Sequence, residues 1–316
     1  MDYFKTHNAA DELKCSKGRY SNFCFDLLEL LYRSDVKNDD ITSDFLIPET
    51  QVGKGRIFAH QAGVIAGLEE VQYFLKKEIS LKNIRFSALV KDGDRVKNGS
   101  ALAALEGTIL DLLKAERVIL NTLQRMSGIA TQASYLVKKV PKNVLIVPTR
   151  KTLWGLLDKK ACTLGGAGTH RLDLQDAVLV KDNHLAAIEQ NFSQLFKRLT
   201  KIPQAELKVL RFIEVEVTSL SAFKKLLEEY EKAPIRPNFL FVMLDNFKPA
   251  GIRATRKYLL KLPFAKSVFL EASGGITLKN ISQYAKTGVQ IISSGALTHS
   301  AASFDCSFEL SFKKRS

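Results

Sequence analysis

Cysteine is scarce in this sequence: the chain has Cys15, Cys24, Cys162 and Cys306, and none of them lies in a CxxC or CxxH pattern. This spacing argues against a zinc site or a disulfide framework and favours free thiols in a reducing compartment. Long apolar runs are also absent, since none approaches the roughly 18 to 20 residues that span a bilayer. The N-terminal MDYFKTHNAADELK lacks the apolar stretch of a signal peptide. We therefore expect a cytoplasmic protein without a membrane span.

Acidic residues are outnumbered: 33 Asp and Glu stand against 47 Lys and Arg, which leaves a formal net charge of +14. Such an excess favours nucleic acid, a membrane surface or a substrate rich in phosphates and carboxylates, unless the basic surface is inert. The cations are spread along the chain, without an RNA-binding aromatic motif, a helix-turn-helix or a zinc spacing. We therefore do not expect nucleic acid as the primary ligand, although a nucleic-acid or anionic-surface protein is the non-enzymatic alternative.

Residues 1–20 show no clear periodicity and are interpreted as an N-terminal extension. From Phe23 to Tyr32, apolar residues recur at helical spacing. Between residues 53 and 107, apolar runs alternate with Asp-Gly and Asn-Gly turns, and GDRVKNGSAL has the pattern of a β-hairpin. With a further helix over residues 68–75, these features predict a small β-rich domain over residues 21–128.

Residues 129–300 follow a different rhythm, after a helical pattern over residues 110–140. Six apolar runs recur between helical segments: VLIVPT, DAVLVKD, FIEVEVT, FLFVMLD, SVFLEASGG and VQIISSGA. Runs that are apolar on both faces are typical of buried parallel strands, and their alternation with helices favours an α/β barrel. The final SFDCSFELSF alternates with period two, which predicts one half-exposed strand in a tail, residues 301–316, that returns to the N-terminal domain.

Polar residues follow these six runs, and the carboxyl ends of barrel strands meet at one rim. In chain order they are Arg150, Lys151, His170, Arg171 and Lys181, then the carboxylates Glu214, Glu216 and Asp245, then Ser273, Gly274 and Gly295. Arg and Lys suit a substrate with several carboxylates, paired carboxylates suit magnesium shared with phosphate, and glycine turns suit a phosphate. Each group alone also has a structural explanation, such as a solvated loop, an interior salt bridge or an ordinary turn, and we interpret His184 as a loop cap.

In its motifs the chain resembles the quinolinate phosphoribosyltransferases. The resemblance runs from Asp39 to Ser300, and its most specific segments are AERVILNTLQRMSGIAT, TRKT, GTHRLDLQDAVLVKDNH, IEVEV, LDNF, EASGGIT and GALTHS. It implies an α/β fold with an N-terminal α/β sandwich domain and an incomplete TIM-like α/β barrel. It also implies a head-to-tail homodimer, with a higher oligomer as the alternative, in which the partner's N-terminal region completes each active site.

The reaction implied by this resemblance is a pentosyl transfer from phosphoribosyl pyrophosphate to quinolinate. Its products are nicotinate mononucleotide, pyrophosphate and carbon dioxide, a step of de novo NAD biosynthesis. The resemblance implies that Lys151, Lys181, Glu216 and Asp245 are catalytic and meet phosphoribosyl pyrophosphate, and that the two acids hold magnesium with the pyrophosphate. It assigns quinolinate to Arg150, His170 and Arg171 together with Arg117 of the neighbouring subunit, and the 5′-phosphate to Ser273, Gly274 and Gly295.

Five positions depart from the family pattern near the acceptor site. Pro148 stands where Asp usually precedes TRKT, Trp154 and Leu157 replace the proline and arginine of TRKTxPGLR, and Ala167 and Thr169 alter the usual GGGxNHR. These changes spare the charged residues, so we expect altered affinity or loop geometry and not inactivity. The enzymatic alternative is a relative that uses nicotinate or another pyridine acid without decarboxylation, although the cationic cluster argues for an acceptor with two carboxylates.

Overall fold

The computed structural model describes residues 2–37, 39–233 and 239–311. The chain divides into two compact units, each assembled from separated stretches. The barrel unit holds residues 2–9, 135–151 and 167–297, and the sandwich unit holds residues 10–134, 152–166 and 298–311. Residues 1–20 were expected to form one extension, but the described N-terminal residues contribute to both units.

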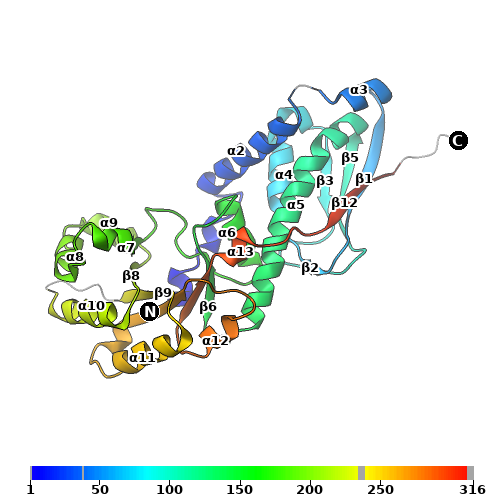
Figure 1. Ribbon diagram of the computed structural model, residues 1–316. Helices are drawn as coiled ribbons and strands as arrows, with labels where there is room; N and C mark the ends of the chain where they lie inside the picture. The colour runs from blue at the N-terminus through cyan, green and yellow to red at the C-terminus, as the bar shows by residue number, and fades with distance from the viewer. Residues whose placement is uncertain (1, 38, 234–238, 312–316) are drawn as a thin grey trace. The chain divides into compact units, whose positions relative to one another are not determined.

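An antiparallel sheet in the order β12-β1-β5-β3 forms the sandwich unit. The strands are β1 (Val52–Ala59), β3 (Arg85–Ala88), β5 (Ala101–Thr108) and β12 (Cys306–Ser311). Helices α4 (Leu68–Lys77) and α5 (Ile109–Lys138) lie against one face, and α2 (Gly18–Asp35) packs on α4 (Figure 1). Ile57 and Leu105 point toward α5 and are buried, as the period-two alternation of a half-covered sheet requires. The remaining elements of this unit are η1 (Ala10–Glu12), α3 (Ile41–Leu46), η2 (Ile79–Leu81) and α6 (Leu156–Leu164).

The hairpin predicted for GDRVKNGSAL is wrong. Its first strand, β4 (Arg95–Val96), pairs with β2 (Gly63–Val64) in a separate two-stranded sheet, while β5 pairs with β1 and β3. The turn chemistry itself is present, because Gly93 and Gly99 both have positive φ, 92° and 81°. A local turn pattern fixes where the chain reverses, but the partners available in space decide which strands pair.

Six parallel strands in the order β6-β11-β10-β9-β8-β7 form the sheet of the barrel unit. They are β6 (Leu145–Pro148), β7 (Val178–Val180), β8 (Ile213–Val217), β9 (Leu240–Asp245), β10 (Val268–Ser273) and β11 (Ile291–Ser294). The helices are α1 (Tyr3–Thr6), α7 (Asp182–Ala186), α8 (Phe192–Leu199), α9 (Gln204–Val209), α10 (Leu220–Lys232), α11 (Pro249–Leu259), η3 (Ala265–Ser267) and α12 (Ile281–Ala285), with α13 (Ala296–His299) at the unit boundary. Each predicted run forms one strand, so the α/β class and the incomplete barrel are confirmed (Figure 1).

Alternation along the central strands arranges the inward-facing side chains in three levels. From bottom to rim they are Phe212, directly before β8, then Glu214 and Glu216 on β8, and Phe269, Glu271 and Ser273 on β10. The bottom level is an aromatic core, since the ring of Phe241 lies 5.7 Å from Phe212 and 5.1 Å from Phe269. The middle level holds two fully buried carboxylates, and the rim holds the residues expected to act on substrates. Among the described residues, no helix combines the length and apolar character needed to cross a membrane.

Candidate active site

Two carboxylates and a lysine lie together where β7, β8 and β9 end. Burial and then the charge of Asp245 raise the pKa of Glu216, whereas the charge of Lys181 lowers it, so all three groups are within electrostatic reach. Glu216 is nearly buried, while Lys181 is exposed and Asp245 is half-buried. Two carboxylates that repel one another beside a solvent-facing rim suit a divalent cation, because the cation would relieve both repulsion and desolvation.

The strained starts of the loops that follow β9 and β10 are hydrogen-bonded to one another at the same rim. The backbone N–H of Asn246 donates to the carbonyl oxygen of Ser273 at 3.0 Å, and Asn246 itself has φ 57°. Gly274 has φ 92°, and a Cβ there would lie 2.2 Å from Oδ1 of Asn246, so only glycine fits. Gly295 follows β11, which lies beside β10. Glycine turns of this kind allow a phosphate to approach the backbone closely.

Two guanidinium groups approach one another, one following β6 and the other in the loop before β7. Arg150 follows β6 and is exposed, whereas Arg171 is only 5% exposed and its Nη1 donates to the carbonyl oxygen of Ala177 at 3.3 Å. Burial and then the charge of Arg150 lower the pKa of Arg171, which places the two cations close together. Lys151 is exposed beside Arg150 in the sequence. Such a cation pair matches an acceptor with two carboxylates.

His170 points into the barrel interior. Its Nε2 lies 3.1 Å from Glu214 and 3.4 Å from Glu271, and its Nδ1 accepts the backbone N–H of Arg171 at 2.8 Å. Burial lowers the pKa of His170, but the two carboxylates raise it to about 9. Burial, followed by the charge of Glu271, raises the pKa of Glu214 to about 7. Near neutral pH this cluster therefore retains protons that isolated side chains would release.

With His7, this cluster is also a candidate metal site by composition. The ligand atoms of His7, His170, Glu214 and Glu271 lie within 4.8 Å of one another, and all four residues are buried. However, the Arg171 N–H that points at Nδ1 of His170 leaves the ring proton on Nε2, the atom that a metal would need. The donor set therefore fits proton sharing between the imidazole and the carboxylates better than metal ligation.

The comparisons with known proteins decide the family. A model of the quinolinate phosphoribosyl transferase N-terminal domain matches residues 40–127, and a model of its C-terminal domain matches residues 129–309. The chain belongs to the quinolinate phosphoribosyltransferase family.

Relatives match over nearly their whole length. The chain is 35% identical over 290 residues to the probable nicotinate-nucleotide pyrophosphorylase (carboxylating) of Methanothermobacter thermautotrophicus. That alignment covers 90% of this chain and 98% of the relative. It is 36% identical over 275 residues to the nicotinate-nucleotide pyrophosphorylase (carboxylating) of Mycobacterium leprae. That alignment covers 86% of this chain and 91% of the relative. Among solved structures, NadC from Streptococcus pyogenes aligns with a TM-score of 0.79 and 31% identity over 92% of this chain and 96% of that one.

Residues that depart from the family pattern are accommodated inside the fold. Pro148 ends β6 opposite Ser294 of β11, and Leu157 is fully buried in α6. Ala167 and Thr169 are both buried in the loop before β7, whereas Trp154 is half-buried. The structure thus places these departures at packing positions and leaves the charged rim residues in place.

Sequence reasoning missed two residues that lie beside the site, Glu271 and His7. Glu271 could have been found, because it precedes Ser273 by two residues in one strand and therefore shares its inward face. His7 has no comparable pattern, since its place depends on tertiary packing. The interpretation of His184 as a cap is confirmed, because its Nδ1 accepts the backbone N–H of Lys181 at 3.0 Å.

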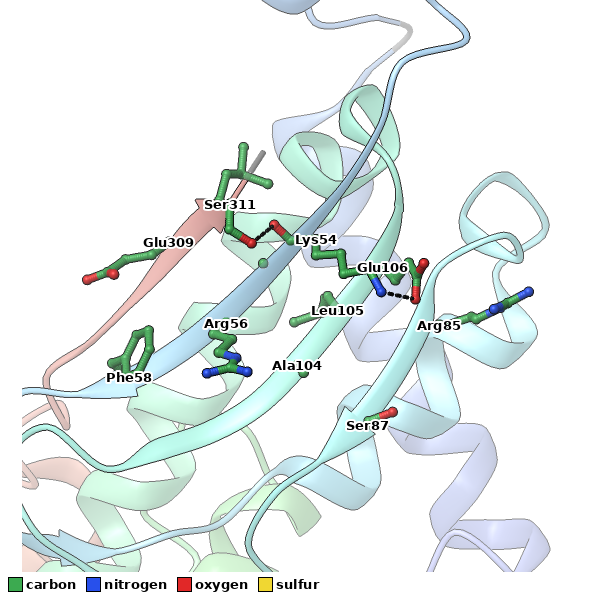
Figure 2. Close-up of a pocket in the computed structure, with 12 residues that line it drawn as sticks. Lys54, Arg56, Phe58, Arg85, Ser87, Ala104, Leu105, Glu106, Glu309 and Ser311 are labelled. Carbon is green, nitrogen blue, oxygen red and sulfur yellow. Dashed lines mark hydrogen bonds and ion pairs between the residues drawn. The ribbon is translucent and has the colours of Figure 1, made fainter. Parts of the chain in front are cut away.

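Arg117 lies in the sandwich unit, on α5, and is exposed with an ion pair to Glu116. The same unit has an uncovered sheet face, with a hollow of about 550 Å³ over β12, β1, β5 and β3. Figure 2 shows Lys54, Arg56 and Arg85 along this open face, with Lys54 3.3 Å from Glu106. Arg117 and this open face therefore lie on different sides of the sheet, because α5 covers the other face.

Proposed function

We propose that the chain transfers the phosphoribosyl group of phosphoribosyl pyrophosphate to quinolinate and releases pyrophosphate and carbon dioxide, forming nicotinate mononucleotide for NAD biosynthesis. The observation that carries the proposal is the presence of two charge groups: a guanidinium pair, Arg150 and Arg171, and a carboxylate pair, Glu216 and Asp245, with Lys181. The first group suits a pyridine dicarboxylate, and the second suits a ribosyl pyrophosphate with its cation.

Arg150 and Arg171 would bind the two carboxylates of the acceptor, with His170 beneath them. Arg171 is nearly buried, so its attraction for a carboxylate is screened less than that of an exposed arginine. Such binding orients the pyridine nitrogen toward the ribosyl carbon, and orientation is the main contribution available where the reaction needs no protein nucleophile. After the nitrogen is alkylated, its positive charge accepts the electrons left by the departing 2-carboxylate.

On the donor side, Lys151 and Lys181 would stabilise the negative charge that develops on the departing pyrophosphate. Glu216 and Asp245 would hold a magnesium ion, which supplies charge neutralisation for the pyrophosphate. Ser273, Gly274 and Gly295 would hold the 5′-phosphate in the turns after β10 and β11. The raised pKa of Glu216 supports the cation assignment, because a bound cation favours the charged form of a desolvated carboxylate.

A product assay tests this reaction. The protein is incubated with quinolinate labelled at the 2-carboxylate, phosphoribosyl pyrophosphate and magnesium, and labelled carbon dioxide and nicotinate mononucleotide are measured. We expect equal amounts of both products, and none without phosphoribosyl pyrophosphate. Nicotinate serves as the competing acceptor: turnover of nicotinate together with no turnover of quinolinate would overturn the assignment in favour of a non-decarboxylating relative.

The active site is proposed to be shared in a cytoplasmic homodimer, completed by the partner's N-terminal domain with its Arg117. Mixing inactive Arg117→Ala and Lys151→Ala subunits should then restore part of the activity, because a mixed dimer contains one site free of both substitutions. The control is each variant mixed with itself. Absence of rescue in mixtures shown to exchange subunits would contradict a shared site.

A further inference from the structure

The N-terminal strap, residues 2–9, packs into the barrel unit although the family match begins at residue 40. The hydroxyl of Tyr3 donates to the carbonyl oxygen of Asn143, just before β6, at 2.6 Å. The ring of Tyr3 lies 5.7 Å from that of Phe269 on β10. The strap therefore contacts the barrel at two separate strands.

Inside the barrel the strap is anchored by His7, which is fully buried. Its ring stacks on Phe212 with centroids 3.9 Å apart and an interplanar angle of 12°, and it lies 4.6 Å from Phe241. Burial and then the neighbouring charge of His170 lower the pKa of His7 well below 6.5. At neutral pH, His7 is therefore an uncharged aromatic ring in the bottom level of the barrel.

The strap is hydrogen-bonded to the loop that carries the acceptor residues. The carbonyl oxygen of His7 accepts the backbone N–H of Thr169 at 2.8 Å and that of His170 at 3.0 Å. In the other direction, the backbone N–H of Ala9 donates to Oγ1 of Thr169 at 2.9 Å. A Cβ on Gly168 would lie 2.6 Å from the His7 carbonyl oxygen, so the loop approaches the strap as closely as glycine allows. Thr169, a departure from the usual family motif, thus bonds to the strap through both its backbone N–H and its side-chain oxygen.

The same loop has an unfavourable backbone that needs support. His170 has φ 52°, in the left-handed region, which is unfavourable for a residue with a side chain. Arg171 follows directly, and its guanidinium is the buried member of the cation pair. On the β6 side the backbone N–H of Gly168 donates to Ile146 at 2.8 Å. The loop is therefore held between β6 and the strap at the point where it directs Arg171.

We propose that the strap is a positioning element of the acceptor site: it fixes the turn 168–171 so that Arg171 faces the acceptor dicarboxylate. This inference rests on the proposed function. Its specific consequence is that loosening the strap should change the KM for quinolinate and not the KM for phosphoribosyl pyrophosphate. The strap is hydrogen-bonded to the acceptor loop, but its described contacts with β8, β9 and β10 are ring contacts at the starts of these strands. The carboxylates and glycine turns assigned to phosphoribosyl pyrophosphate lie at the opposite ends of the barrel strands and have no hydrogen bond to the strap among those described. Loosening the strap should weaken quinolinate binding selectively.

The test uses steady-state kinetics of the full-length chain and of Thr169→Val, which keeps the side-chain shape. The substitution removes the acceptor for Ala9 and also the hydroxyl's own bond to the His170 carbonyl oxygen, so the deletion of residues 2–9 tests the strap alone. We expect KM for quinolinate to rise about 10-fold, with kcat and KM for phosphoribosyl pyrophosphate within about 2-fold of wild type. Thr169→Ser, which keeps the hydroxyl, should restore KM. Deletion of residues 2–9 should raise KM for quinolinate further.

The matched control is Thr287→Val, because Thr287 is another buried threonine of the barrel unit, with its hydroxyl bonded to the Tyr284 carbonyl oxygen at 2.6 Å. It should lose similar stability without a change in KM. An unchanged KM for quinolinate in Thr169→Val, or an equal rise for both substrates, would overturn the positioning role. A wild-type enzyme that does not turn over quinolinate would overturn the proposed function instead. Thr169→Val still tests the positioning role if the chain that lacks residues 2–9 does not fold.

Discussion

Glu214 and Glu216 both lie on β8, but at different depths inside the barrel. We expect this depth to decide whether a carboxylate acts on substrates or contributes to the stability of the fold. Glu216, at the rim, is 8% exposed and lies near a lysine and a second carboxylate. Glu214, two residues earlier, faces the same interior but is fully buried, and its nearest charged partner is His170 at 3.1 Å. The strand repeat that makes both residues face inward thus produces one group open to substrates and another enclosed by protein.

The difference teaches which kind of partner each level requires. At the rim, charges can be satisfied by water, substrate or cation, so the residues need not neutralise one another. In the middle level no such partner enters, so charge must be balanced by an imidazole and by retained protons. Substitutions at the rim should therefore change turnover and spare stability, whereas substitutions below it should change stability and its pH dependence.

The largest expected effect belongs to Lys151→Ala at the rim. Removing a cation that acts on the departing pyrophosphate should lower kcat by at least about 100-fold, because such charge contacts strengthen in the transition state. The midpoint of thermal unfolding should stay within about 2 °C of wild type, since Lys151 is exposed. The matched control is Lys257→Ala, an exposed lysine on α11. Near wild-type turnover of Lys151→Ala would remove this residue from the donor site.

An intermediate effect is expected for Gly274→Ala, because this glycine lies in the turn assigned to the 5′-phosphate. The methyl group would meet Oδ1 of Asn246 at 2.2 Å, and φ 92° adds strain of about 1–3 kcal/mol. KM for phosphoribosyl pyrophosphate should rise at least about 10-fold as the turn shifts, a loss of more than about 1.4 kcal/mol.

Gly275→Ala separates strain from collision, because Gly275 has φ 61° but no atom within 4 Å of the added methyl. It should destabilise the protein and leave that KM nearly unchanged. Equal KM effects in the two variants would show that strain alone, and not the collision, disturbs the phosphate turn.

Much of the barrel could be predicted because its information is local. The run IEVEV contains both the strand and its alternation, and the polar residues after each run mark the rim without knowledge of the tertiary fold. The same logic extends to Glu271, which was missed although its spacing from Ser273 determines its face. Patterns of this kind identify strands and faces, but they do not specify depth, which depends on how many levels the barrel stacks.

Pairing between distant segments could not be predicted in the same way. The Asn-Gly and Asp-Gly turns around β4 were recognised, yet β4 pairs with β2, a partner that no local pattern names. His7 is the extreme case, because its burial against Phe212 depends on a contact over two hundred residues of sequence. Such contacts depend on the space left inside the folded barrel, and local sequence patterns carry no information about that space.

The smallest effect on turnover is expected for the middle level, where the pH dependence of stability should change instead. The pKa of Glu214 is about 7 in the folded chain against an ordinary 4.5, so between these values the folded state binds more protons than the unfolded state. The free energy of unfolding should therefore fall as pH rises from about 4.5 to 7, by at most about 1.4 kcal/mol per pH unit from this group.

Glu214→Gln, which stays neutral, should flatten that slope in urea unfolding measured at several pH values. Glu70 in the sandwich unit, with a pKa of about 7, contributes to the same window in both proteins. The difference from wild type therefore reports the barrel cluster, Glu214 together with His170, whose pKa Glu214 raises. Glu216→Gln at the rim is the control and should change the slope less, because its carboxylate keeps contact with solvent and Lys181. An equal flattening in both variants would mean that depth in the barrel does not separate the two carboxylates.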